Sequence, residues 1–353
     1  MSGQTSFGAF HDVPRLRLGS LPCPGLFSLF ETADPAQLGS HSYSGTTDAA
    51  EADEVERGIL YTCRGGFLDI SHIRDSADMV AYIHARIHYA LEHDWQCVKF
   101  RAHEPSVFTV TFTYPSFWSM MAPEDRARIL DELSIRCAQQ IAYAAVTWHE
   151  ILTWYGYKTT VVLSEQQSAF TYEDCPSHLL GILIAGDALR SPASFDDAVT
   201  VGLNDALAWL EVVDEDAMLA AVDSVEGQWW QDGQVIRRMV VYDEFDATII
   251  PWLVPTCEAC PSPTAVRLQL PSVKDVEGYP FDGVWSMTIE PNVFETSRIL
   301  DRLPKGTDVV DPAVHFPILL DDIRRTIGVN RTTGLDVPDW SPDRPLGASS
   351  SGR

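Results

Sequence analysis

The densest grouping of chemically reactive side chains lies in residues 63–75, where a glycine turn leads into a predicted helix. A turn of this kind brings backbone N–H groups and the positive end of a helix to one point, where a thiolate or an oxyanion is stabilised. Asp69 and His72 are three residues apart and would share one helical face, so the carboxylate could orient the imidazole or bind a metal beside it. Arg74, on the same helix, is expected to support these groups. The competing interpretation is that Asp69 caps the helix and His72 packs beside it.

A second grouping, Trp148–Gly156, lies near the end of the longest predicted helix. His149 and Glu150 begin like the zinc-protease helix pattern, in which two histidines one turn apart hold zinc and the intervening glutamate acts on water. Thr153 stands where the second histidine would be, so the motif is incomplete and any metal would need ligands from elsewhere in the chain. A histidine near a helix C-terminus also gains from the helix dipole without any catalytic role.

A third grouping, Ser164–Asp174, falls between a predicted strand and a predicted helix. Site residues concentrate in loops at strand ends, and Glu165 could supply a carboxylate that faces a cleft. Ser168 lacks the Gly-x-Ser-x-Gly elbow of serine hydrolases, so it is expected to support the site rather than act as a nucleophile. Thr171 and the acidic residues after it are equally typical of a helix start.

The spacing of apolar residues predicts the elements that must position these groups. The predicted helices are 71–93, 123–155, 173–189, a helical pair within 194–225, and 311–327. The predicted strands are 58–62, 97–100, 107–114, 159–163, 264–270 and 284–289, with further strands within 235–254 and a hairpin turn near 101–106. Long helices first and strands late favour an α+β fold, with the N-terminal helices packed on a mixed or antiparallel sheet and a helix at the C-terminal end.

The chain is expected to form one domain. We assign residues 1–56 to an extended acidic N-terminal segment, 57–330 to a single α+β domain and 331–353 to a disordered tail. A break near residues 228–233 is the alternative boundary.

Charge limits the partners that the protein can bind. Lys and Arg total 25 and Asp and Glu total 50, so the net charge of the 353-residue chain is −25. Such a chain repels nucleic acid and anionic membrane surfaces, whereas a neutral or cationic substrate or a metal ion suits its field. No segment approaches the roughly 20 apolar residues that span a bilayer. The substrate, whether a small molecule or a peptide, and the oligomeric state are left open.

The cysteines bear on the compartment. Their number, seven, is odd and they are scattered along the chain, which does not indicate a disulfide framework. Cys257 and Cys260 form a lone Cys-x-x-Cys pair, whereas a structural zinc site would need a second pair. Residues 1–30 contain no basic start followed by an apolar block, so a cytoplasmic location is expected; a leader missing from the true N-terminus would make the protein exported.

Four separated stretches of the sequence resemble, in the same order, the bacterial family known as domain of unknown function 4056. They are Leu38–Tyr43, Gly58–Asp75, Trp148–Tyr157 and Ser164–Gly181. The resemblance implies that relatives are often exported or lipid-anchored, and this chain departs from them in having no leader. It implies no particular reaction, but it draws attention to His41.

Two classes of function are compatible with these residues. In the first, the protein is a metal-dependent or general acid/base hydrolase. His72, His149 and Glu165 would then bind a divalent cation, zinc or manganese, and Glu150 would act as the base. Asp69 would orient His72.

A variant of the enzyme class is a thiol hydrolase with Cys63 as nucleophile, its thiolate stabilised by the helix start and by Arg64, and with His41 or His149 as base. In the second class, the protein is a non-catalytic binding or interaction protein, and the same polar cluster is a structural hydrogen-bond network. Geometry separates the two classes, because metal-assisted catalysis requires the three predicted ligands to meet at one point in an accessible pocket.

Overall fold

The computed structural model describes residues 8–25, 30–44, 57–156, 165–241, 248–292 and 298–329. The predicted strand at 159–163, the predicted tail and residues 45–56 of the acidic segment lie outside these ranges.

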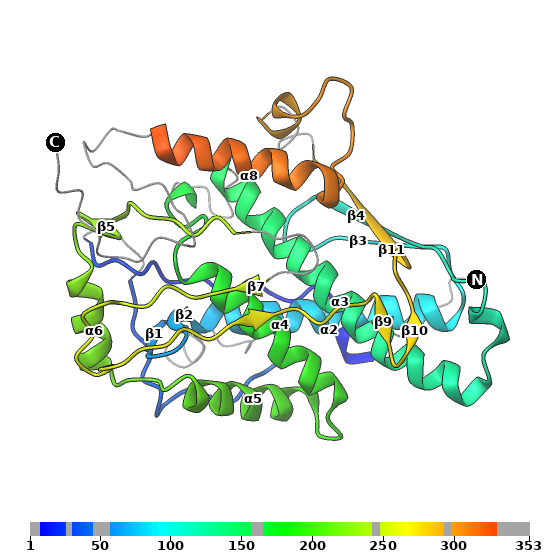
Figure 1. Cartoon of the computed structure of the whole chain (residues 1–353), viewed down its shortest axis with the longest axis horizontal. Helices are drawn as coiled ribbons and strands as arrows, with labels where there is room; N and C mark the ends of the chain where they lie inside the picture. Colours follow the sequence, from blue (N-terminus) through cyan, green and yellow to red (C-terminus); the bar gives the residue numbers. More distant parts are fainter. Residues whose placement is uncertain are drawn as a thin grey trace.

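Three long helices form the centre of the fold: α2 (Ile70–Glu92), α3 (Pro123–Trp154) and α4 (Asp174–Arg190). α2 packs against both α3 and α4 (Figure 1). Asp69 precedes α2 and its carboxylate accepts a hydrogen bond from the backbone N–H of Ser71, which stabilises the first turn. The ends of all three helices lie within one residue of their predicted positions.

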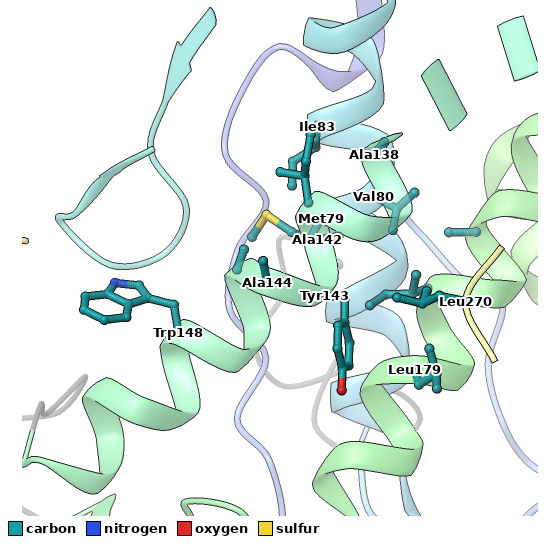
Figure 2. Close-up of a cluster of buried hydrophobic side chains, with 14 of the residues drawn as sticks. Met79, Val80, Ile83, Ala138, Ala142, Tyr143, Ala144, Trp148, Leu179 and Leu270 are labelled. Carbon is teal, nitrogen blue, oxygen red and sulfur yellow. The ribbon is translucent and has the colours of Figure 1, made fainter. Parts of the chain in front are cut away.

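Between α2 and α3, large apolar side chains lie against small ones. Figure 2 shows Met79, Val80 and Ile83 of α2 in one buried cluster with Ala138 and Ala142 of α3. Alanine adds little bulk, so the two helix backbones can approach closely while the larger side chains fill the remaining space. The central helices therefore form a rigid support for the polar residues at their ends.

A three-stranded antiparallel sheet has the order β11-β4-β3, from β3 (Cys97–Phe100), β4 (Val107–Phe112) and β11 (Trp285–Glu290). β3 and β4 form the predicted hairpin. Every second side chain of β4 is buried, as expected for a strand with one face on the core. β11 pairs along the whole of β4, so the late part of the chain is attached to the early hairpin.

The remaining elements are shorter or peripheral. They are β1 (Ile59–Thr62), β2 (Gly66–Asp69), α5 (Phe195–Trp209), α6 (Glu215–Ser224), β5 (Trp230–Gln231), β6 (Gln234–Val235), β7 (Thr248–Ile249), β8 (Leu268–Gln269), β9 (Asp275–Val276), β10 (Tyr279–Pro280), α8 (Pro312–Val329) and the 3₁₀ turns η1 (Gly8–Phe10), η2 (Trp118–Met120), η3 (Glu165–Gln167) and η5 (Leu300–Arg302). This is an α+β architecture, as predicted. None of the helices in the described ranges combines the length and the apolar character needed to cross a membrane.

The predicted strands within 235–254 and 264–270 are too long. In the described residues of these segments, only two-residue ladders form, β6 with β5 and β7 with β8. Four prolines between β7 and β8 limit the length of the paired strands, because each lacks the N–H that a ladder needs. They are Pro251, Pro255, Pro261 and Pro263.

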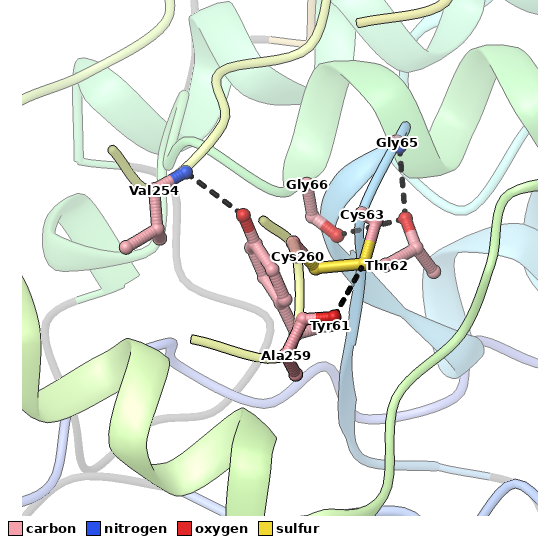
Figure 3. Close-up of a disulfide and its surroundings, with 8 residues drawn as sticks. All are labelled: Tyr61, Thr62, Cys63, Gly65, Gly66, Val254, Ala259 and Cys260. Atoms are coloured by element: carbon pink, nitrogen blue, oxygen red, sulfur yellow. Dashed lines mark hydrogen bonds between the residues drawn. A yellow bond between two sulfur atoms is a disulfide. The ribbon is translucent and has the colours of Figure 1, made fainter. Parts of the chain in front are cut away.

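A disulfide joins Cys63, directly after β1, to Cys260 in the connection between β7 and β8 (Figure 3). The cysteine number and scatter predicted no disulfide framework and gave no indication of this single bond. Close to it, the backbone N–H of Val254 donates to the hydroxyl of Tyr61 at 2.8 Å (Figure 3). The connection between β7 and β8 is therefore attached to the β1–β2 hairpin by a covalent bond and by a hydrogen bond.

Replacing Cys260 with serine is expected to lower the free energy of unfolding by about 2–5 kcal/mol, because a bridge between residues far apart in sequence restricts the unfolded chain. The separation here is 197 residues. Urea unfolding without reductant measures the change. Cys97→Ser, at an exposed free cysteine, is the matched control and should leave the midpoint unchanged. Identical midpoints for the two variants would show that the bridge contributes nothing.

Candidate functional site

Three histidines from the three central helices line one small cavity. His72 lies in the first turn of α2, His149 near the end of α3 and His178 in the second turn of α4. The cavity has a volume of about 30 Å³, which is room for one or two water molecules. The side chains of His72 and His149 are 17% and 22% exposed, so solvent reaches this place.

The close crossing of α2 and α4 places His72 beside His178. A Cβ atom on Gly181 of α4 would lie 2.1 Å from the carbonyl oxygen of Ile73 in α2, so the crossing requires glycine. As a result, the N-terminal parts of the two helices adjoin, and the rings of His72 and His178 stack with their centroids 4.7 Å apart.

His149 is paired with a carboxylate from the connection between β3 and β4. Its Nδ1 forms a hydrogen bond with the carboxylate of Glu104, which is buried. Burial by itself would lower the pKa of His149, but the hydrogen bond and the charge of Glu104 outweigh it and raise the pKa to about 9. The other ring nitrogen, Nε2, has no hydrogen-bond partner among the described residues. This ring is therefore fixed at one nitrogen and available at the other.

His178 lies between Ser76 and Glu150. Its Nδ1 is 2.8 Å from the Ser76 hydroxyl, and its Nε2 is 3.6 Å from Oε1 of Glu150 without forming a hydrogen bond. The backbone N–H of Phe170 donates to the other carboxylate oxygen, Oε2, at 2.6 Å. Burial, with a contribution from the charge of Asp174, raises the pKa of Glu150 to about 8. Burial and the neighbouring histidines lower the pKa of His178 well below its usual value.

His72 lies between two carboxylates. Its Nδ1 is 3.2 Å from Oδ1 of Asp174 and 3.9 Å from Oδ2 of Asp69. Burial would lower the pKa of His72, but the charges of Asp69 and Asp174 raise it well above its usual value. Both interpretations of Asp69 apply, because the same carboxylate caps α2 and lies near the imidazole.

The structure brings part of the predicted site together. Of the predicted metal ligands, His72 and His149 line the same cavity. The side chain of the third, Glu165, lies outside the described residues. Glu150, the predicted base, contacts His178 and does not line the cavity, which does not favour the role of base for this residue.

Arg74 and Ser168 do not line the cavity either. The guanidinium of Arg74 is buried and donates to the carbonyl of Gly39 at 2.6 Å, so it holds the N-terminal segment onto α2. The carbonyl oxygen of Ser168 accepts a hydrogen bond of 3.4 Å from the hydroxyl of Thr171 within a turn. Their contacts are those of residues that maintain the local fold.

Cys63 and His41 do not form a catalytic pair. Cys63 is bonded to Cys260 and therefore has no thiol to act as a nucleophile, so the thiol-hydrolase prediction is wrong for this form of the protein. His41 is buried elsewhere, with its Nε2 at 3.0 Å from Asp78 and its ring against Phe195. It belongs to a network that attaches the N-terminal segment to α2.

Three residues of the observed arrangement are absent from the sequence predictions: Glu104, Asp174 and His178. Asp174 and His178 are four residues apart on α4, and this spacing was the available signal, because it places both on one helical face. Glu104 lies in a hairpin connection, where no local pattern identifies a carboxylate that contacts a distant helix.

Within the six described ranges, no three His, Cys, Asp or Glu side chains surround a common point that could hold a metal ion. The imidazoles instead lie in separate contacts with the carboxylates of Asp174, Glu150 and Glu104. In this conformation the arrangement is suited to the transfer of protons.

The fold and the site thus define an α+β protein with a histidine–carboxylate cluster between three helices. The chain belongs to the family described as "Protein of unknown function (DUF4056)", whose model matches residues 4–248, as the resemblance predicted. The matched part includes the whole cavity, whereas Cys260, β11 and α8 lie beyond it. Searches of curated proteins and of solved structures find no match.

Proposed function

We propose that this protein is a hydrolase whose proton-transfer pair is His149 and Glu104. The observation that supports this is the position of the pair at the wall of a cavity with room for water. A carboxylate that holds one ring nitrogen fixes the orientation of an imidazole and leaves the other nitrogen to donate or accept a proton. Proton transfer by such a group accelerates reactions by about 10²–10⁴-fold.

In the proposed reaction, a water molecule in the cavity attacks the electrophilic carbon and gives a proton to Nε2 of His149. The same nitrogen then donates this proton to the departing group as its bond to the carbon breaks. One water is consumed, the hydroxyl remains on the carbon and the proton leaves with the departing group. Glu104 stabilises the imidazolium without itself taking a proton. His72 lines the same cavity and supplies a hydrogen bond to the water or to the oxyanion.

The net charge of −25 favours an uncharged or cationic substrate, because a field of this sign repels anions as they approach. We test this with p-nitrophenyl esters and p-nitroanilides that carry a neutral, a cationic or an anionic group, each added to the wild-type protein. Turnover of neutral or cationic members is expected, with anionic ones at least about tenfold slower. Rates equal to those of buffer across the whole panel would contradict the proposal.

A non-catalytic role is the second candidate, and one observation favours it. The His149–Glu104 contact joins α3 to the connection between β3 and β4, so it could serve only to hold that connection. In that case, His149→Gln would lower the unfolding midpoint, and the panel would show no turnover by either protein.

We also propose that the protein is located outside the cytoplasm. Disulfides persist in oxidising compartments, so the Cys63–Cys260 bond favours an extracytoplasmic location over the cytoplasmic one expected from the sequence. Alkylation of protein trapped directly from living cells tests this. Labelling of Cys63 and Cys260 before any reductant is added would place the protein in a reducing compartment instead.

A further inference from the structure

We propose that a divalent cation of the zinc or manganese class binds between α2, α3 and α4, with His72 Nδ1, Glu150 Oε1, Asp174 Oδ1 and His178 Nε2 as its ligands. This site adjoins the cavity, since two of the ligands, His72 and His178, also line it. The inference extends the proposed function. The binding of the cation does not depend on that function, but a role of the cation in hydrolysis rests on it.

The first argument is that the side chains of Glu150, Asp174 and His178 each have one polar atom in a hydrogen bond and a second polar atom outside it. Oε2 of Glu150 accepts the N–H of Phe170, and Oδ2 of Asp174 accepts the N–H of Thr171 at 2.7 Å. The atoms that remain, Oε1 of Glu150 and Oδ1 of Asp174, are the ones that face the two imidazoles. Two consecutive backbone N–H groups thus orient both carboxylates in the way expected for ligands.

His178 follows the same rule. The Nδ1 of His178 is held by the hydroxyl of Ser76, the kind of contact that orients an imidazole whose other nitrogen binds a metal. Among the described residues, His178 Nε2, His72 Nδ1 and Asp174 Oδ1 are buried without a hydrogen bond of acceptable geometry. The side chains of Asp174 and His178 are 1% and 8% exposed, so water does not readily satisfy these atoms.

The second argument is distance. His72 Nδ1 and Asp174 Oδ1 are 3.2 Å apart, and His178 Nε2 and Glu150 Oε1 are 3.6 Å apart. Neighbouring ligands of a tetrahedral zinc ion with bonds of about 2.0–2.1 Å lie roughly 3.3 Å from each other. The two contacts therefore have the length of two edges of such a shell, and the stacked rings of His72 and His178 place them next to each other.

The third argument is charge. The carboxyl groups of Glu150, Glu173 and Asp174 are all buried here, and the guanidinium of Arg238 acts on all three. An ionised carboxylate in such a place needs a compensating charge. A divalent cation supplies it at the point where the imidazoles and carboxylates meet. Since no three donors yet surround one point in the described residues, binding requires side-chain rotations that close the two contacts into one shell.

A binding measurement on the full-length protein tests the inference. The chain is stripped with a chelator and titrated with Zn²⁺ and with Mn²⁺, and bound metal is measured by elemental analysis. About one ion per chain is expected for the wild type, and His178→Gln and Asp174→Asn should each weaken binding by at least about 100-fold. His88→Gln, which changes a partly exposed histidine on α2 that contacts Asp131, is the matched control and should bind like the wild type.

Ser76→Ala keeps all four ligands and removes only the partner of His178 Nδ1, so about 10–100-fold weaker binding is expected. It decides the question if a ligand variant fails to fold, as judged by circular dichroism. Absence of binding by the wild type, or equal binding by wild type, Ser76→Ala and His88→Gln, overturns the inference. Because metal is measured without substrate, a protein that binds the ion but hydrolyses nothing retains this site and loses the proposed function. A protein that hydrolyses the substrates but binds no metal retains the proposed function and loses this site.

Discussion

Replacing His149 with glutamine is expected to lower kcat/KM for the hydrolysed members of the substrate panel by about 10²–10⁴-fold. Glutamine keeps a polar group beside the buried carboxylate of Glu104 but cannot transfer a proton. The structural reason for the size of the effect is that Nε2 of His149 is the ring nitrogen left without a partner in the described residues, on a side chain that lines the cavity. Initial rates of the purified variant, compared with the wild type, measure the loss.

His88→Gln is the control for this prediction as well. His88 is a partly exposed residue of α2, in contact with Asp131, and it does not line the cavity. Its variant should retain wild-type rates. An equal loss in both variants would indicate a general effect on the protein, and no loss in either would remove His149 from the reaction.

Replacing Gly181 with alanine is expected to lower the free energy of unfolding by at least about 2 kcal/mol, because the added methyl group overpacks a helix crossing. The new Cβ would lie 2.1 Å from the carbonyl oxygen of Ile73, and backbone atoms cannot move aside as a flexible side chain can. α4 must therefore shift away from α2, which also separates His72 from His178. Urea unfolding gives the stability change.

Gly202→Ala is the matched control, since Gly202 is also a helical glycine. Its added Cβ would meet only a methyl group, Cγ2 of Ile184, at 3.0 Å. Alanine is favoured over glycine in a helix by up to about 1 kcal/mol, so this variant should be as stable as the wild type or slightly more stable. Similar unfolding midpoints for Gly181→Ala and Gly202→Ala would contradict a tight crossing at Gly181.

The helices are the part of the fold that could be predicted best from the sequence, because their signals are local. The apolar positions of α2 repeat at three and four residues, and Asp69 and Pro123 mark the beginnings of α2 and α3. The pairing of the late strands could not be predicted, since β11 and β4 join residues that are far apart in sequence. The same reason applies to Cys63 and Cys260, whose spacing carries no sign of a bond.

The same distinction between local and distant signals applies to the candidate site. His72 and His149 were identified because each lies in a compact motif at a helix end, and both do line the cavity. Glu104 could not be identified, because its role depends on the hairpin connection reaching α3. Glu150 shows the opposite difficulty: its neighbour in sequence suggested a zinc-protease pattern, but α3 directs the two side chains to different partners, Glu104 for His149 and His178 for Glu150.

The account's central claim is that Glu104 and His149 act as one catalytic unit, and a double-mutant cycle tests it most directly. The rates of Glu104→Gln, His149→Gln and the double variant are measured on the same substrate. Groups that act together lose their effect together, so the double variant should be no more than about threefold slower than His149→Gln alone. If the two single losses instead multiply in the double variant, the carboxylate and the imidazole work independently and the claim is contradicted.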